Sequence, residues 1–175
     1  MGRSGNNTRP AQQLVNLKIS MKNLEGLLAA NFGDGAQLLT LAYGEGVLAP
    51  SRKLAEIQIR DWMRTAREKR GQRVRYIRAT EWKEAGRGNT IHRVVMGLSK
   101  ASAASLAGLW EYGPVKVETV QGEDMEALAA FLMRPALEAQ RNPVPCGHIW
   151  APSHGLIRPE QKGEKRHELS EPHGG

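Results

Sequence analysis

The sequence predicts an α+β fold, in which a largely antiparallel five-stranded sheet has helices packed on one face. Two observations lead to this class. Short segments in which apolar and polar residues alternate are separated by longer segments whose apolar residues have helical spacing. Two of the short segments follow each other directly across a glycine-containing turn, which is typical of an antiparallel hairpin. Helices on one face would leave the other face of the sheet open for a ligand.

The predicted strands are runs of alternating or β-prone residues. They cover residues 14–20, 36–43, 74–82, 90–96 and 115–119. In the first of them, Val15, Leu17 and Ile19 alternate cleanly with polar side chains. The third and fourth strands form the hairpin, with its turn at residues 86–89.

The predicted helices begin at suitable capping residues. They cover residues 21–31, 52–70, 100–110 and 122–135. Ser20, Ser51 and Ser99 can cap the first three helices, and Pro135 marks the expected end of the last one. The second helix has apolar residues at helical spacing, which form its buried stripe: Ala55, Ile59, Trp62, Met63 and Ala66.

The chain is predicted to consist of one folded domain with two extensions. Residues 1–12 form a disordered arm, residues 13–140 form the domain, and the Pro- and Gly-rich residues 141–175 form an extended, partly disordered tail. No apolar run reaches the roughly 18 residues of a membrane-spanning helix, so we expect no membrane partner. Cys146 is the only cysteine, which favours a cytoplasmic location, where disulfides are rare.

Positive charge is concentrated in one segment. Residues 52–93 hold 13 basic and 5 acidic residues, while the chain as a whole has a net charge of +7. Such a field favours a polyanionic partner, although basic residues can also coat a solvated helix face. The candidate nucleic-acid contacts are Arg60, Arg64, Arg67, Lys69, Arg70, Arg73, Arg75, Arg78, Arg87 and Arg93.

The predicted hairpin carries the candidate metal ligands. Glu81 ends the third strand and His92 lies in the fourth. A carboxylate and an imidazole on neighbouring strands can share Mg²⁺ or Mn²⁺. The competing interpretation is structural, with Glu81 a carboxylate at the hairpin end and His92 a hydrogen-bonded histidine of the sheet. Spacing alone favours the structural interpretation.

Several short segments between residues 17 and 159 resemble the motifs of one family, in the same order and with similar spacing. They are Leu39-Thr40-Leu41-Ala42-Tyr43, the strand from Arg75 to Trp82, Ile91-His92, Leu109-Trp110 with Gly113, the helix from Ala127 to Leu132, and the ending Trp150, Ser153, Leu156 and Pro159. The family is that of the rolling-circle replication initiators of phages and plasmids, the HUH endonucleases.

The resemblance implies DNA nicking, in which two histidines and an acidic side chain hold Mg²⁺ or Mn²⁺ and a helix tyrosine attacks the scissile phosphate. The chain departs from this pattern at its centre. The position of the tyrosine is Phe131, which has no hydroxyl, and the basic position after it is Arg134. The position of the second histidine is Val94, or Thr90 if the register shifts. Nicking is therefore expected to be weakened or lost.

We therefore expect residues 13–140 to be an HUH-like domain that binds single-stranded or hairpin DNA, as a replication accessory or regulator. A first alternative is an active metal-dependent nickase that uses a displaced tyrosine such as Tyr112. A second is an RNA-binding protein with an RRM-like plan, in which Tyr76 and Trp82 share a strand face and stack on bases. A role in binding protein partners through the acidic residues 94–139 stays open.

Overall fold

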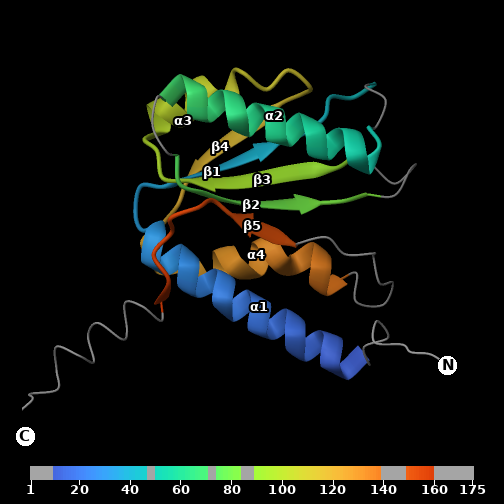
Figure 1. Cartoon of the computed structure of the whole chain (residues 1–175), viewed down its shortest axis with the longest axis vertical. Coiled ribbons are helices and arrows are strands. Elements are labelled where there is room, and N and C mark those ends of the chain that lie inside the picture. The colour runs from blue at the N-terminus through green and yellow to red at the C-terminus, as the bar shows by residue number, and fades with distance from the viewer. Residues whose placement is uncertain (1–9, 47–49, 71–73, 84–88, 139–148, 160–175) are drawn as a thin grey trace, which may run out of the picture.

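The computed structural model describes residues 10–46, 50–70, 74–83, 89–138 and 149–159 (Figure 1). The helices are α1 (Pro10–Asn31), α2 (Arg52–Arg70), α3 (Lys100–Ala107) and α4 (Met125–Glu138), with a short 3₁₀ turn, η1 (Gly122–Asp124), before α4. The strands are β1 (Gln37–Leu41), β2 (Tyr76–Glu81), β3 (Ile91–Met96), β4 (Val115–Thr119) and β5 (Trp150–Pro152). Within these residues, no helix is long and apolar enough to cross a membrane.

The five strands form one sheet in the order β4–β1–β3–β2–β5. Every neighbouring pair is antiparallel. The α+β class and the five-stranded antiparallel sheet are therefore confirmed. β2 and β3 pair with Tyr76 opposite Met96 and Glu81 opposite Ile91, as the predicted hairpin requires. Residues 86–88 of its predicted turn lie outside the described part of the chain.

Helices cover both faces of the sheet: α1 and α4 lie on one face, and α2 and α3 on the other (Figure 1). The prediction of helices on one face describes the α1/α4 face, but the face expected to be open for a ligand is covered as well. The reason is that the central strands carry apolar side chains on both faces of the sheet. Leu38 and Val95 belong to the core under α1 and α4, whereas Leu39, Leu41 and Val94 belong to the core under α2 and α3. Strands of this kind require cover on both faces.

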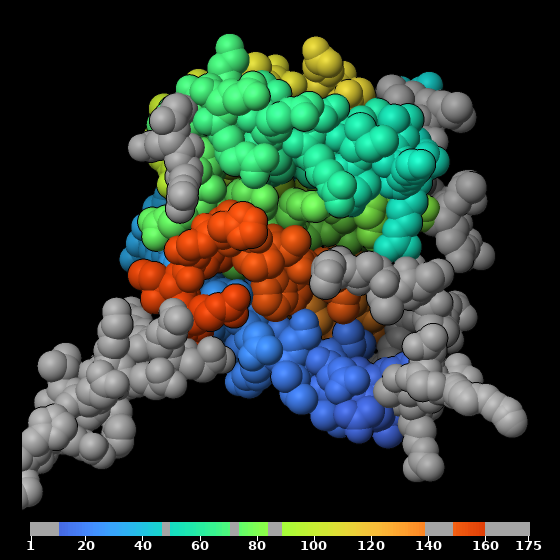
Figure 2. All heavy atoms as spheres, in the orientation of Figure 1, coloured from blue at the N-terminus to red at the C-terminus, as the bar shows by residue number. Residues whose placement is uncertain are grey.

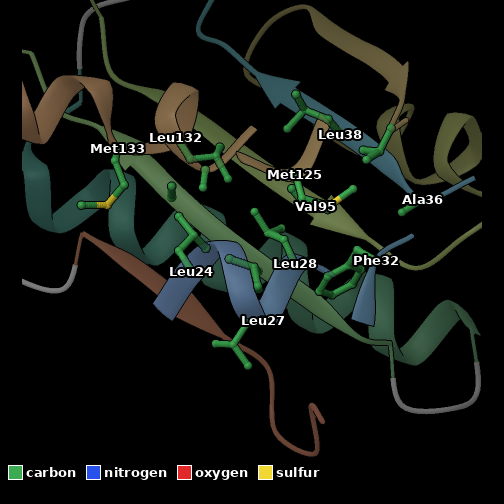
Figure 3. Close-up of a cluster of buried hydrophobic side chains, with 14 residues drawn as sticks. Leu24, Leu27, Leu28, Phe32, Ala36, Leu38, Val95, Met125, Leu132 and Met133 are labelled. Atoms are coloured by element: carbon green, nitrogen blue, oxygen red, sulfur yellow. The ribbon is translucent and has the colours of Figure 1, made fainter. Parts of the chain in front are cut away.

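Large aliphatic side chains fill the core between the sheet and the α1/α4 pair (Figure 3). Leu24 and Leu28 from α1 and Leu132 and Met133 from α4 belong to one cluster with Val95 of β3 (Figure 3). Each of the five is at most 3% exposed. Burying a side chain of this size contributes about 1.5–3 kcal/mol, so this cluster is a major source of stability and fixes α4 against the sheet.

Residues 14–20 lie within α1, so the prediction of a strand there was wrong. Ser20 is likewise inside the helix and not its N-cap. A helical stripe crosses the predicted boundary and packs on the core: Leu17, Met21, Leu24 and Leu28. The alternating Val15 and Ile19 that suggested a strand are exposed, at 48% and 55%. Burial of the longer stripe outweighs the exposure of these two side chains.

The fifth strand comes from the segment predicted to be a tail. β5 pairs with the free edge of β2, and the chain after it is held by a side chain of α1. Asn31 Nδ2 donates to the Ile157 carbonyl and Asn31 Oδ1 accepts from the Ile157 N–H, both at 2.8 Å. The fold therefore includes residues 149–159, assigned above to the tail, and residues 10–12, assigned above to the disordered arm.

Two predicted helix starts are confirmed, and two predicted ends are wrong, because α3 ends at Ala107 and α4 continues past Pro135. Ser51 and Ser99 each accept a hydrogen bond from the backbone N–H three residues later, at 3.1 and 3.2 Å, and are confirmed as caps. Pro135 lies inside α4, which continues to Glu138. The fixed φ of proline is compatible with a helix, and the cost is the hydrogen bond that a residue at 135 would donate to the Phe131 carbonyl.

Candidate functional site

Exposed basic side chains follow the outer surface of α2, which lies uncovered at the surface of the molecule (Figure 2). The buried stripe of this helix is the predicted one: Ala55, Ile59, Trp62, Met63 and Ala66. Lys53, Arg60, Arg64 and Arg67 are all exposed and are separated by seven, four and three residues. This spacing places them on one face of the helix, away from the buried stripe. We call these four residues the basic stripe.

The predicted nucleic-acid contacts separate into exposed and buried groups. Six are exposed: Arg60, Arg64, Arg67, Lys69, Arg70 and Arg75. Two others are largely buried, because the side chains of Arg78 and Arg93 are only 17% and 9% exposed. Arg78 pairs with Glu56, and Arg93 pairs with Glu81, each at 2.9 Å. These two arginines belong to internal ion pairs and are not part of the exposed basic surface.

Arg73 and Arg87 lie outside the described residues. Lys53 was missed, although its distance of seven residues from Arg60 was a usable signal of a shared helix face. The exposed contacts therefore concentrate on α2 and the segment directly after it.

The two predicted metal ligands lie on opposite faces of the sheet. Glu81 stands opposite Ile91 in the β2–β3 ladder, whereas His92 stands opposite Thr80. Successive side chains of a strand point to opposite faces, so Glu81 lies on the α1/α4 face and His92 on the α2/α3 face. The structure does not bring them together, which contradicts a metal ion shared by Glu81 and His92 and supports the structural interpretation of both residues.

His92 belongs to a buried chain of hydrogen bonds beneath α2. Its Nδ1 lies 3.0 Å from Thr80 Oγ1, and its Nε2 lies 3.2 Å from the Tyr43 hydroxyl. The Tyr43 hydroxyl donates to Gln58 Oε1 at 2.8 Å. Because the Tyr43 hydroxyl uses its only proton in the bond to Gln58, its oxygen accepts a hydrogen bond from His92 Nε2–H. His92 Nδ1 then accepts a hydrogen bond from the Thr80 hydroxyl. The chain Thr80–His92–Tyr43–Gln58 therefore assigns the neutral Nε2–H tautomer to His92.

Burial sets the protonation of this chain. His92 is 1% exposed, and its burial, with the nearby Arg78 cation as a second cause, lowers the pKa of His92 from 6.5 to about 4. Burial, followed by the influence of Tyr112, raises the pKa of Tyr43 to about 12. Tyr43 is therefore held as a neutral phenol, which is a weak nucleophile.

On the α1/α4 face, Arg93 contacts two of the residues predicted for the catalytic centre, Glu81 and Phe131. The Arg93 guanidinium lies over the Phe131 ring, 4.7 Å from its centroid, and Arg134 lies 5.3 Å from the same centroid. Arg93 also donates to Glu81, whose other carboxylate oxygen is 2.7 Å from Lys83 Nζ. Sequence reasoning placed Arg93 among the nucleic-acid contacts and missed it as the partner of Glu81. The alternation along β3, which puts residues 91 and 93 on one face, was the signal.

Tyr76 and Trp82, the expected base-stacking pair, do share one face of the sheet. That face is covered, and both rings pack against the core beneath α2 and α3. The Arg52 guanidinium lies 4.7 Å from the centroid of a Trp82 ring. A stacking platform of the RRM type needs an open strand face, and these two side chains do not provide one.

The chemistry offered by the described residues is thus a basic surface on α2 and two internal polar clusters. Within these residues, no group of three or more His, Cys, Asp or Glu side chains could hold a metal ion. Cys146, the only cysteine of the chain, lies outside the described residues. No protein-family model, no curated protein and no solved structure matches this chain.

Proposed function

We propose that the protein binds DNA, single-stranded or hairpin, through the basic stripe of α2, and acts as a replication accessory or regulator without efficient nicking. The observation that carries the proposal is the basic stripe itself. The replication role and the form of the DNA rest on the resemblance to rolling-circle initiators. A cytoplasmic location is part of the same proposal.

The geometry of the stripe suits a phosphate backbone. From Lys53 to Arg67 the helix rises about 21 Å, which is about the length of six base-pair steps of a duplex. Arg60 and Arg64 pair with Glu56 at 3.5 Å and Asp61 at 2.7 Å, but both arginines are at least 63% exposed. Exposed pairs of this kind are worth about 0–1 kcal/mol, so their arginines can exchange these partners for phosphates.

The position of the charges supports a binding role over a purely structural one. Basic residues in the last turn, such as Arg67, stabilise a helix through its dipole. The first turn of α2, however, holds no acidic residue and includes Lys53, whose charge is unfavourable at that end. A helix face selected only for stability and solubility would place acidic residues there.

The expectation of weak or absent nicking rests on the attacking group. Phe131 has no hydroxyl, and Tyr43 is 7% exposed and already hydrogen-bonded. With Mg²⁺ or Mn²⁺ and single-stranded DNA, we expect no denaturant-stable covalent adduct on a denaturing gel. An adduct mapped to Tyr112, Tyr76 or Tyr43 would support the nickase alternative and contradict this part of the proposal.

The binding proposal is tested by neutralising the stripe and by varying the salt concentration. The variant is Arg60→Gln/Arg64→Gln/Arg67→Gln, measured by fluorescence anisotropy with a labelled hairpin oligonucleotide. We expect the slope of log affinity against log salt to become shallower by about 2–3 units, because each lost phosphate contact removes about 0.7–0.9.

The matched control makes the same change of charge elsewhere. Lys18→Gln/Lys22→Gln/Lys116→Gln alters exposed residues of α1 and β4, and we expect it to keep most of the salt slope. Equal effects of the two triple variants would mean that only net charge matters. Stronger competition by an RNA oligonucleotide than by DNA of the same sequence would favour the RNA-binding alternative.

A further inference from the structure

Glu81 is neutralised from two sides. Arg93 Nη1 lies 2.9 Å from Glu81 Oε1, and Lys83 Nζ lies 2.7 Å from Glu81 Oε2. The Glu81 and Arg93 side chains are only 14% and 9% exposed, so this pair is shielded from water. Each carboxylate oxygen therefore already has a cation at contact distance, and charge-assisted bonds of this kind are the strong ones.

Arg93 joins three elements of the fold at this point. It belongs to β3, its guanidinium pairs with Glu81 of β2, and the same guanidinium lies over the Phe131 ring of α4. Arg134 of α4 approaches that ring as well. Arg93 Nε is buried and has no hydrogen-bond partner among the described residues. Two cationic side chains, Arg93 and Lys83, thus bind one carboxylate at the junction of β2, β3 and α4.

We infer that the Arg93 guanidinium is the permanent cation of this centre and that it binds the Glu81 carboxylate in place of a divalent metal ion. The residues present do not fit the metal that the resemblance implies. Glu81 is already neutralised, and His92 faces away with both ring nitrogens hydrogen-bonded. A divalent ion would meet the positive charges of Arg93 and Lys83 at this carboxylate.

The sheet register specifies where metal ligands would have to be. Ile91 stands directly opposite Glu81, and Arg93 lies two residues further along the same face. Positions 91 and 93, and not 92 and 94, therefore share a face with Glu81. Position 91 holds an apolar side chain and position 93 holds a cation. The centre therefore lacks metal ligands because of these two residues, which share the face of Glu81, and not only because one histidine is missing.

The inference is tested with Mn²⁺ alone, by electron paramagnetic resonance and titration calorimetry on the full chain. Wild-type protein and Glu81→Gln should bind Mn²⁺ equally weakly. The variant Ile91→His/Arg93→His should bind Mn²⁺ at least tenfold more tightly than wild type, and adding Glu81→Gln should abolish that gain. Circular dichroism and thermal unfolding establish that each variant is folded.

The matched control places two imidazoles at the same spacing on the other face. Val94→His, together with the natural His92, should give no Glu81-dependent Mn²⁺ binding, because residues 92 and 94 face α2. Wild-type Mn²⁺ binding that is lost in Glu81→Gln would overturn the inference, and this comparison does not depend on whether the histidine variants fold. A Glu81-dependent site in Val94→His would overturn it as well.

Discussion

The two faces of the sheet are stabilised by different kinds of interaction. On the α1/α4 face, apart from the Glu81–Arg93 pair, the core consists mainly of aliphatic side chains. On the α2/α3 face, aromatic rings surround a buried histidine, and the His92 ring lies edge-on to those of Tyr43, Trp82 and Trp110. Aliphatic burial has no preferred direction, whereas hydrogen bonds do. The hydrogen bonds of the α2/α3 face therefore add directional constraints to the packing of its helices.

Directed bonds on the α2/α3 face connect particular elements. Trp62 Nε1 donates to the Leu106 carbonyl at 3.0 Å and joins α2 to α3. Trp110 Nε1 donates to the Ala42 carbonyl at 2.8 Å and joins the segment after α3 to the end of β1. Since α2 also carries the basic stripe, the surface proposed to bind DNA stands on the polar, aromatic side of the sheet.

The largest expected effect belongs to the aliphatic face. Leu28→Ala removes a side chain that is 0% exposed, and such changes cost about 2–5 kcal/mol of unfolding free energy. We expect the same loss at pH 7 and at pH 5 in urea unfolding, because no titrating group is altered. Ile19→Ala, at a position 55% exposed on the same helix, is the control and should change stability by less than about 0.5 kcal/mol. A loss that differs strongly between the two pH values would mean that the two faces are not independent.

The class of the fold, the central hairpin and the edge strand β4 could be predicted from periodicity, but the first half of α1 and the opposite edge, β5, could not. Val15 and Ile19 gave an alternating pattern that ended at a serine, and the helical stripe of α1 continues across that boundary. Ser20 instead accepts a hydrogen bond from Trp150 Nε1 at 2.9 Å. β5 has only three residues, too few for a periodic pattern, and its pairing depends on a β2 edge that is distant in sequence.

The candidate site was predicted only in part because its geometry depends on register. Periodicity shows that residues 92 and 94 share a face, but not which face of β3 matches Glu81. A shift of one residue in the hairpin register would reverse that match. The resemblance named Phe131 and Arg134 but not Arg93, whose contacts with Glu81 and with the Phe131 ring required the three-dimensional pairing. The exposed face of α2 needed only helical spacing and was therefore predictable.

The second prediction concerns the α2/α3 face and its dependence on pH. The pKa of His92 is about 4 in the folded protein and 6.5 as the ordinary value, so the unfolded chain binds the proton more tightly. Stability is therefore complete above pH 6.5 and falls as the pH decreases towards 4. Between pH 7 and pH 5 the expected loss of unfolding free energy is about 2 kcal/mol, measured by urea unfolding at several pH values.

This pH window isolates His92 from the carboxylates. Cations and hydrogen bonds outweigh the effect of burial and lower the pKa of Glu56 and of Glu81 below 4.5, so their contributions are lost only at more acidic pH. His92→Gln should be less stable than wild type at pH 7 but should lose much less stability between pH 7 and pH 5. An unchanged slope in this variant would assign the acid sensitivity to another group.

The smallest expected effect tests the hydrogen-bonded chain on the α2/α3 face directly. Tyr43→Phe removes the hydroxyl that accepts from His92 Nε2–H and donates to Gln58, and leaves both groups without that partner. We expect a loss of about 1–2 kcal/mol in unfolding free energy, the usual cost of leaving buried polar groups unpaired. Tyr112→Phe removes the hydroxyl of a neighbouring ring that is not part of this hydrogen-bonded chain, and it should lower the unfolding free energy by less.

The direction of these hydrogen bonds is tested by the tautomer of His92. Long-range ¹H–¹⁵N correlation spectra should show the Nε2–H tautomer of His92 in the wild-type protein. A wild-type Nδ1–H tautomer would contradict the direction assigned to these hydrogen bonds, and equal losses from the two tyrosine variants would mean that the α2/α3 face, like the α1/α4 face, depends mainly on packing.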